Sequence, residues 1–346
     1  MNNVVFYRKY RPQKFEDVIG QDNTVRILKN AISKKRLAHA YLFSGPRGTG
    51  KTTVARILAR EAGCFEEDIN EIDAASSRGI DEARALREAV RVLPLRSPYK
   101  VYIIDEVHML TKEAFNALLK TLEEPPEHAI FILATTELHK VLDTIVSRTQ
   151  HFEFHKISIP DIISELKKIC QKESIKIDDD AMKLIAFFAD GALRDAENIL
   201  FQVSTLGEKN IKEGDVRALL GAPEEESVNQ ITSFALAGSI AEMLKELDSV
   251  LESGVEPHLL GKLILRNFRA AYFLSLDPKT EEILRHEFSE DEIQFYSSLA
   301  KDKARLVFAV EQVLWALGTF SDDATSHMPL ELALIKTAAF GNKQAG

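Results

Sequence analysis

Five short apolar runs alternate with helical patterns in the first half of the chain. Residues 40–44 read AYLFS and lead into a glycine-rich loop, after which a helical pattern covers residues 52–61. Further apolar runs lie at 71–74, 101–105, 129–135 and 151–154, and further helical patterns lie at 81–93 and 111–123. Because strands that alternate with helices favour parallel pairing through helical crossovers, this half predicts an α/β domain with a parallel sheet.

The strand pattern stops near residue 156, and the remainder of the chain has helical periodicity. Residues 160–219 predict three or four helices, and the sequence GAP followed by acidic residues at 224–226 predicts a linker. Residues 227–341 again show Leu, Ile and Phe at helical spacing. We therefore predict an α/β domain at 1–156, a small helical domain at 157–220, a larger all-helical domain at 221–341 and a tail at 342–346.

Composition places the chain among ordinary globular proteins. Its 346 residues are 45% hydrophobic and 28% charged. No apolar run approaches the roughly 18 residues that a membrane span needs, and the first residues have no apolar signal-peptide core. Only two cysteines, Cys64 and Cys170, are present, which fits a reducing compartment. We expect a cytoplasmic protein without membrane contact.

Charge is distributed unevenly along the chain. The net charge is −9, but the first 60 residues contain 13 Lys and Arg against 3 Asp and Glu. The basic N-terminal stretch is suited to phosphate groups, and a solvated surface beside a nucleotide site explains the charge equally well.

The glycine-rich loop matches the phosphate-binding pattern G-x-x-x-x-G-K-[ST]. Glycines allow backbone N–H groups to surround phosphate oxygens, and the following helix presents its positive end. We expect Lys51 to reach the β- and γ-phosphates of ATP and Thr52 to coordinate Mg²⁺. The predicted nucleotide-binding stretch comprises Gly45, Pro46, Arg47, Gly48, Thr49, Gly50, Lys51, Thr52 and Thr53.

The apolar run that begins at residue 101 ends in two carboxylates, Asp105 and Glu106. Asp105 is expected to bind Mg²⁺ directly or through water, and Glu106 is expected to act as a general base on the attacking water. Two acids after a strand can also be simple helix caps, but the phosphate-binding loop favours catalysis. Thr136 ends the next strand, where a hydroxyl can contact phosphate or water, and His108 is expected to pack.

Other candidate metal ligands have simpler structural interpretations. The acidic run at 178–180 precedes an apolar helical pattern, so helix capping is favoured over a metal site. His151 and His155 are four residues apart, but they lie in a strand-like alternation, which favours a structural role.

The motifs GPRGTGKT, IDEVHMLT, LLKTLEEPP, ATTE and SRT occur in this order and resemble the AAA+ clamp-loader ATPases. Within that group the chain is most similar to the bacterial DNA polymerase III gamma/tau family, whose N-terminal pattern also resembles YRKYRP here. The resemblance is dense over residues 4–200 and mainly architectural over 221–341, where it implies a collar-like oligomerisation domain after a helical lid domain.

The resemblance assigns further roles to individual residues. Thr136 matches the sensor-1 position, Arg194 matches the sensor-2 arginine, and Arg148 matches an arginine finger that acts on ATP bound by a neighbouring subunit. The base pocket is implied near Tyr10, Arg11, Pro12 and Ile19. Together with Thr136, Arg148 and Arg194, the expected catalytic set comprises Lys51, Asp105 and Glu106.

The family resemblance implies an ATP-driven subunit that opens a sliding clamp and loads it onto primer–template DNA. Implied partners are copies of the chain and other loader subunits in a pentamer, the clamp, DNA and the DNA polymerase III core. Arg78 is the first candidate for DNA contact. The length of the chain favours a short gamma-like or truncated form.

The sequence departs from the family pattern between 62 and 70, where the family usually has a four-cysteine zinc module. One cysteine cannot form a tetrahedral Cys₄ site, so we expect no zinc. Thr149 also replaces the cysteine that usually follows the finger. Two alternative functions remain: a non-catalytic scaffold subunit of the loader, and another AAA+ DNA-remodelling motor such as a branch-migration helicase.

Overall fold

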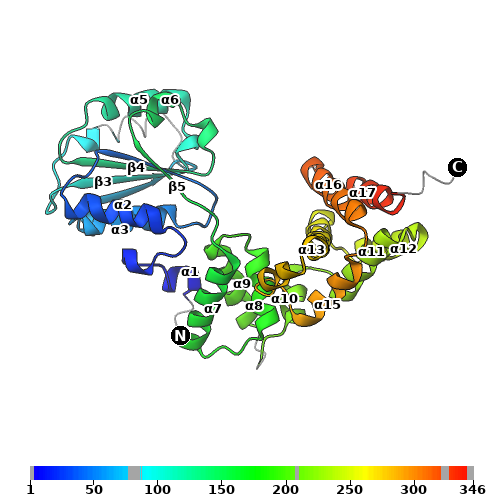
Figure 1. Cartoon of the computed structure of the whole chain (residues 1–346). Helices are drawn as coiled ribbons and strands as arrows, with labels where there is room; N and C mark the ends of the chain where they lie inside the picture. The colour runs from blue at the N-terminus through cyan, green and yellow to red at the C-terminus, as the bar shows by residue number, and fades with distance from the viewer. Residues whose placement is uncertain (1–3, 77–85, 87, 207–209, 321–326, 341–346) are drawn as a thin grey trace. The chain divides into compact units, whose positions relative to one another are not determined.

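The structure, a computed structural model, describes residues 4–76, 86, 88–206, 210–320 and 327–340. The chain forms two compact units (Figure 1). The first unit comprises Met1–Ile169 and Phe188–Phe201, and the second comprises Cys170–Phe187 and Gln202–Gly346. The three domains expected from the sequence stay a prediction.

A five-stranded parallel sheet forms the centre of the first unit. Its strands are β1 (Ala40–Ser44), β2 (Ile69–Asp73), β3 (Lys100–Asp105), β4 (Ala129–Thr135) and β5 (Gln150–Glu153). Their order in the sheet is β2-β3-β4-β1-β5, and every neighbouring pair is parallel. The predicted α/β class with a parallel sheet is confirmed.

Helices cover both faces of this sheet, as Figure 1 shows. Among the described residues, the covering helices include α2 (Asp22–Ser33), α3 (Lys51–Glu61), α5 (Lys112–Glu123) and α6 (Asp143–Val146). Along β1, Tyr41 and Phe43 pack with α2 and α3, whereas Ala40 and Leu42 pack with α5 and α6. Successive side chains of a strand point to opposite faces, so a strand buried on both faces is apolar throughout.

The remaining elements of the first unit are short helices and the first parts of two longer ones. The short helices are α1 (Phe6–Lys9) and the 3₁₀ turns Phe15–Asp17, Glu66–Asp68, Val107–Met109 and Leu138–Lys140. Helices α7 (Ile159–Glu173) and α9 (Leu193–Ser204) begin in this unit. The ring of Phe6 packs edge-on against that of Phe201, with centroids 5.1 Å apart, and this contact joins α1 to α9.

The second unit is helical in its described part. It contains α8 (Asp179–Phe188), α10 (Glu213–Leu220), α11 (Glu225–Ala237), α12 (Ile240–Glu252), α13 (Pro257–Leu276), α14 (Glu281–Leu284), α15 (Glu290–Leu299), α16 (Lys303–Thr319), α17 (Met328–Ala338) and the 3₁₀ turn Pro278–Thr280. Helix α13 packs against α11, α15 and α16. Its buried Arg266 pairs with Glu292 of α15 at 3.1 Å. Across the described ranges, every helix is too short or too polar to traverse a bilayer.

Candidate nucleotide-binding site

The phosphate-binding loop connects β1 to α3 and depends on glycine at close contacts. A Cβ at Gly45, where φ is +138°, would collide with the carbonyl oxygen of Phe154. A Cβ at Gly48, where φ is +75°, would lie 2.7 Å from the Cβ of Ala192. Both conformations and both contacts exclude a larger residue, so the loop is held in one shape by the end of β5 and the segment before α9.

Lys51 begins α3 and is almost fully buried, with 6% of its surface exposed. Its Nζ donates hydrogen bonds to the carbonyl oxygens of Gly45 at 2.7 Å and Pro46 at 2.8 Å. Burial lowers the pKa of Lys51, and the negative charges of Glu106 and Asp105 partly oppose that change. The Lys51 ammonium group therefore lies beside the positive N-terminal end of α3 and the N–H groups of the loop. Together these groups favour the binding of a negatively charged phosphate.

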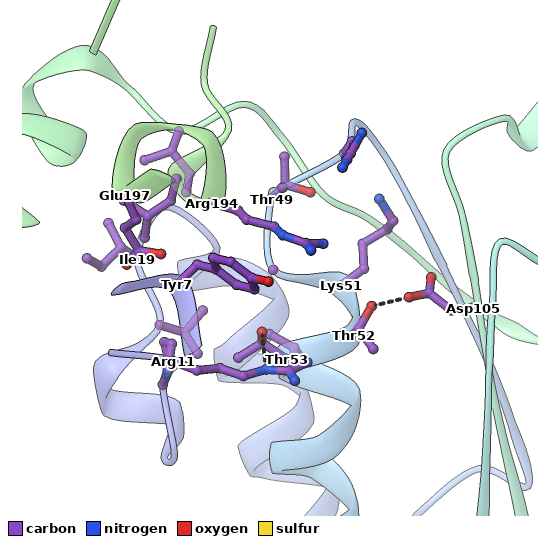
Figure 2. A pocket seen from close by; sticks show the side chains of 18 of the residues that line it. Tyr7, Arg11, Ile19, Thr49, Lys51, Thr52, Thr53, Asp105, Arg194 and Glu197 are labelled. Carbon is purple, nitrogen blue, oxygen red and sulfur yellow. Dashed lines mark hydrogen bonds between the residues drawn. The ribbon is translucent and has the colours of Figure 1, made fainter. Parts of the chain in front are cut away.

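Asp105 reaches the same loop from the end of β3. The Thr52 hydroxyl donates to Asp105 Oδ2 at 2.7 Å, as the dashed line in Figure 2 shows. In a parallel sheet the carboxyl ends of neighbouring strands share one edge, and β4 lies between β3 and β1. Two hard oxygen donors beside a phosphate site fit Mg²⁺, which takes its other ligands from water and phosphate. The described residues include no group of three or more His, Cys, Asp or Glu suited to a metal by itself.

Glu106 adopts a left-handed backbone with φ of +49°, which is unusual for a residue other than glycine. Its Oε2 accepts hydrogen bonds from the backbone N–H of Thr136 at 3.2 Å and from the Thr136 hydroxyl at 3.0 Å. Behind it, His108 Nδ1 lies 3.0 Å from Thr135 Oγ1 and 3.4 Å from Glu106 Oε2. This network fixes the Glu106 carboxylate at the end of β4.

A cavity of about 370 Å³ opens above this loop. Its lining includes the following residues expected from the sequence: Arg11, Pro12, Ile19, Arg47, Gly48, Thr49, Gly50, Lys51, Thr52, Thr53, Asp105, Glu106 and Arg194. Figure 2 shows Arg194 extending from α9 toward the loop, while Lys51 and Asp105 lie at the opposite side of the pocket from Ile19. The fold thus gathers residues that are up to 190 positions apart in the chain, Tyr7 and Glu197, into one pocket.

The other expected site residues lie outside the lining. Gly45 and Pro46 contact it through Lys51, and Thr136 contacts it through Glu106. Tyr10 packs edge-on against Phe6, with ring centroids 5.9 Å apart.

Arg148 follows α6 and does not line the pocket of its own chain. It donates to the carbonyl oxygen of Thr144 at 2.8 Å and to Glu123 Oε1 at 3.0 Å, and its side chain is 37% exposed. Arg78 lies outside the described residues.

Several pocket residues were not anticipated from the sequence. The most informative are Tyr7, whose ring lies 4.6 Å from the guanidinium carbon of Arg194, and Glu197, one turn after Leu193 on α9. The sequence offered one indication for Glu197. It follows Arg194 by three residues, and residues three or four apart on a helix share a face. Val18, Ile157 and Leu193 add apolar surface to the lining.

Hydrogen bonds from Arg11 and Gln21 attach the N-terminal segment to the rest of the site. Arg11 Nε donates to the Thr53 hydroxyl at 3.1 Å, and burial, followed by the nearby charge of Arg56, lowers the pKa of Arg11. Buried Gln21 donates through Nε2 to the carbonyl oxygen of His155 at 2.8 Å. The segment therefore forms a fixed wall of the pocket.

A phosphate-binding loop after β1, carboxylates after β3 and this strand order define a P-loop ATPase fold of the AAA+ class. The family model "DNA polymerase III, delta subunit" matches residues 20–78 and 66–158, and "DNA polymerase III clamp loader subunit, ATPase lid domain" matches 161–209. DNA polymerase III subunit gamma of Buchnera aphidicola (subsp. Acyrthosiphon pisum) is 37% identical over 84% of this chain and 85% of the relative. The chain belongs to the DNA polymerase III gamma/tau family.

Two further comparisons define the extent of the likeness. DNA polymerase III subunit tau of Bacillus subtilis is 40% identical over 82% of this chain and 54% of the relative, so the chain spans about half the length of that protein. Among solved structures, the Thermotoga maritima RuvB Holliday junction branch migration motor aligns with a TM-score of 0.52 at 21% identity. That alignment covers 65% of this chain and 79% of RuvB, and it shows the shared fold alone.

Proposed function

We propose that this chain binds and hydrolyses ATP with Mg²⁺ as a clamp-loader subunit, and so helps to open a sliding clamp and load it onto primer–template DNA. The observation that supports this best is the set of complementary groups in one pocket. A buried lysine, a Thr52–Asp105 hydrogen bond of 2.7 Å and a fixed Glu106 carboxylate lie around the same loop. These are the parts that phosphoryl transfer to water needs.

Each residue has a role that follows from its position. Lys51 would leave its loop carbonyl partners to bind the β- and γ-phosphates, while Thr52 and Asp105 would hold Mg²⁺. The bound ion would neutralise phosphate charge. Glu106 would orient the attacking water, and Thr136, which donates to Glu106, would sense the γ-phosphate at the same time. Arg194 would contact the phosphates from α9.

Arg148 is proposed to act on ATP held by a neighbouring subunit. Its partners in this chain are Glu123 and the Thr144 carbonyl, both outside the pocket. A partly exposed guanidinium in a surface ion pair can change partner at low cost, because such pairs contribute about 0–1 kcal/mol. Arginine fingers supplied by a neighbour accelerate phosphoryl transfer by roughly 10³–10⁵ in other NTPases.

The proposed partners follow from the proposed clamp-loader function. They are further copies of this chain and other loader subunits in a pentamer, the clamp, primer–template DNA and the DNA polymerase III core, within the cytoplasm. DNA binding would be directed at phosphates and would weaken with salt. Arg78 remains the proposed first DNA contact.

A non-catalytic scaffold would not need Lys51, Asp105 and Glu106 arranged in this way. A branch-migration motor shares the fold, but the family relationship favours the loader. Neither alternative is supported by a separate feature of the pocket.

The first test measures ATP turnover by the chain with its companion loader subunits, with and without clamp and primed DNA. Wild type should be stimulated by clamp plus DNA, and Arg148→Ala should lose at least a hundredfold of that stimulated rate. Glu123→Gln is the matched control, because it removes the same ion pair and keeps the guanidinium. ATP turnover that is not stimulated by clamp and DNA would refute the loader function.

A mixing experiment tests whether Arg148 acts between subunits. Lys51→Ala copies keep Arg148, and Arg148→Ala copies keep the phosphate-binding loop. Loaders assembled from both variants should contain some interfaces in which an intact phosphate-binding loop faces an intact Arg148. Their ATP turnover should exceed that of loaders made with either variant alone. No gain in mixed loaders of confirmed assembly would contradict action in trans.

A further inference from the structure

Glu197 is a buried acid in the nucleotide pocket that the catalytic roles above do not use. It lies on α9, lines the cavity and has 5% of its surface exposed. In the part of the chain that the structure describes, its carboxyl group has neither a hydrogen bond nor an ion pair. Buried polar groups are nearly always partnered in folded proteins, so this carboxyl lacks a partner that a ligand can supply.

The surroundings of Glu197 identify the end of the pocket to which it belongs. Figure 2 shows it on the same side as Ile19, away from Lys51 and Asp105 at the phosphate end. Val18, Ile157 and Leu193 contribute apolar lining to the cavity. Apolar lining together with a small number of polar groups is the usual form of a ligand site, in which the polar groups fix the orientation of the ligand.

We propose that Glu197 recognises the purine base, with its carboxyl group accepting a hydrogen bond from the 6-amino group of adenine and donating one to the adjacent ring nitrogen. The proposal rests on the proposed function, because it assumes that this pocket holds ATP. It makes Glu197 the residue that favours adenine over guanine nucleotides.

The hydrogen-bonding chemistry of the two bases supports this assignment. A protonated carboxyl group has one donor and one acceptor, whereas an ionised one has acceptors only. Adenine presents a donor at N6 beside an acceptor at N7, whereas guanine presents two acceptors at O6 and N7. A protonated Glu197 therefore pairs with adenine and leaves its own acceptor unpaired against that edge of guanine.

The environment keeps the carboxyl group protonated near neutral pH. Burial, followed by the negative charge of Glu165 on α7, raises the pKa of Glu197 to about 8. Other ionisable groups around the same cavity are Tyr7, Arg8, Arg11, Arg194 and Glu71, with Lys51, Asp105 and Glu106 at the phosphate end. None of them is hydrogen-bonded or ion-paired to Glu197 in the described structure.

The test uses the full chain and competition against a fluorescent ADP derivative labelled on the ribose. Competitors are ADP, GDP and purine riboside diphosphate, which lacks the 6-amino group. In wild type ADP should bind about tenfold to a hundredfold more tightly than either competitor, the range expected for one bidentate base contact. Glu197→Leu should lose most of this preference, and Glu197→Gln should keep it, because an amide also offers one donor and one acceptor.

The pH dependence separates recognition from packing. The wild-type affinity for ADP should fall as pH rises from 6.5 to 9, because the ionised carboxylate can no longer donate to the ring nitrogen, while the affinity of Glu197→Gln should stay level. Any change shared by both proteins belongs to the other ionisable groups. Glu165→Gln is the matched control, since it removes the charge that raises the Glu197 pKa and should move the fall to lower pH.

The outcomes distinguish this inference from the proposed function. Unchanged ADP preference in Glu197→Leu, with the variant still folded by circular dichroism, would overturn the role of Glu197 and leave ATP binding intact. Failure of wild type to bind ADP or ATP at all would overturn the proposed function itself. An equal loss of affinity for all three competitors would assign Glu197 a purely structural role and also refute base recognition.

Discussion

Replacing Asp68 by alanine should destabilise the first unit severely. Asp68 has no exposed surface, and its carboxylate accepts four hydrogen bonds. The donors are the backbone N–H groups of Leu95 at 2.7 Å, Arg96 at 3.0 Å and Ser97 at 3.0 Å, and the Ser97 hydroxyl at 2.7 Å. These bonds connect the start of β2 to the chain that leads into β3.

The magnitude follows from the number and kind of bonds lost. A hydrogen bond to a charged group contributes about 1.5–3 kcal/mol, and leaving a buried donor unpaired costs about 1–3 kcal/mol. Water entering the space vacated by Asp68 would recover part of this loss. We expect Asp68→Ala to lower the free energy of unfolding by about 3–5 kcal/mol. Asp68→Asn, which keeps one acceptor oxygen, should lose less.

Acid should remove the contribution of Asp68 to the free energy of unfolding. Burial by itself would raise the pKa of this carboxyl group, but the four hydrogen bonds outweigh burial and lower the pKa to about 2. Because the folded-state pKa lies below the unfolded value of about 3.9, the stabilisation is complete above that value and is lost as pH falls toward 2. Wild type and Asp68→Ala should therefore converge in stability in acid.

Urea unfolding at pH 7, followed by circular dichroism, measures the effect. The chain has one tryptophan, Trp315, which lies in the second unit, so its fluorescence monitors that unit separately and should change little. Asp73→Ala removes an exposed carboxylate from the other end of β2 and is the matched control. An Asp68→Ala transition at the same urea concentration as wild type would refute the reasoning.

Two further predictions concern the pocket wall. Gly48→Ala should weaken ATP binding at least tenfold, because the new Cβ meets Ala192 and the φ of +75° costs roughly 1–2 kcal/mol; Gly221→Ala, at a φ of +62° with open space, should cost stability but leave ATP affinity unchanged. Tyr7→Leu should weaken ATP binding about threefold to tenfold by removing the ring beside Arg194, while Tyr7→Phe should keep most of the affinity. Equilibrium titration with a fluorescent nucleotide measures both, and wild-type affinity in Gly48→Ala or in Tyr7→Leu would contradict the corresponding assignment.

The sequence determined those parts of the protein whose physics is local. The glycines, Lys51 and Thr52 are adjacent in the chain, so their spacing alone predicted a phosphate-binding loop. Strand-like runs of four to seven residues between helical patterns predicted the parallel sheet, because such alternation favours helical crossovers between parallel strands. Asp105 and Glu106 were found from the same pattern, since they lie at the end of one of those runs.

Tertiary structure decided what depends on distant segments. The order of the strands places β4 between β3 and β1, and only that order brings Thr136 to Glu106 and Asp105 to Thr52. Glu197 occupies an amphipathic helix where an acid is ordinary, and its chemistry follows from burial that no local pattern reveals. A short-range pattern specifies conformation, but burial and the identity of neighbours arise only when segments far apart in the chain pack together.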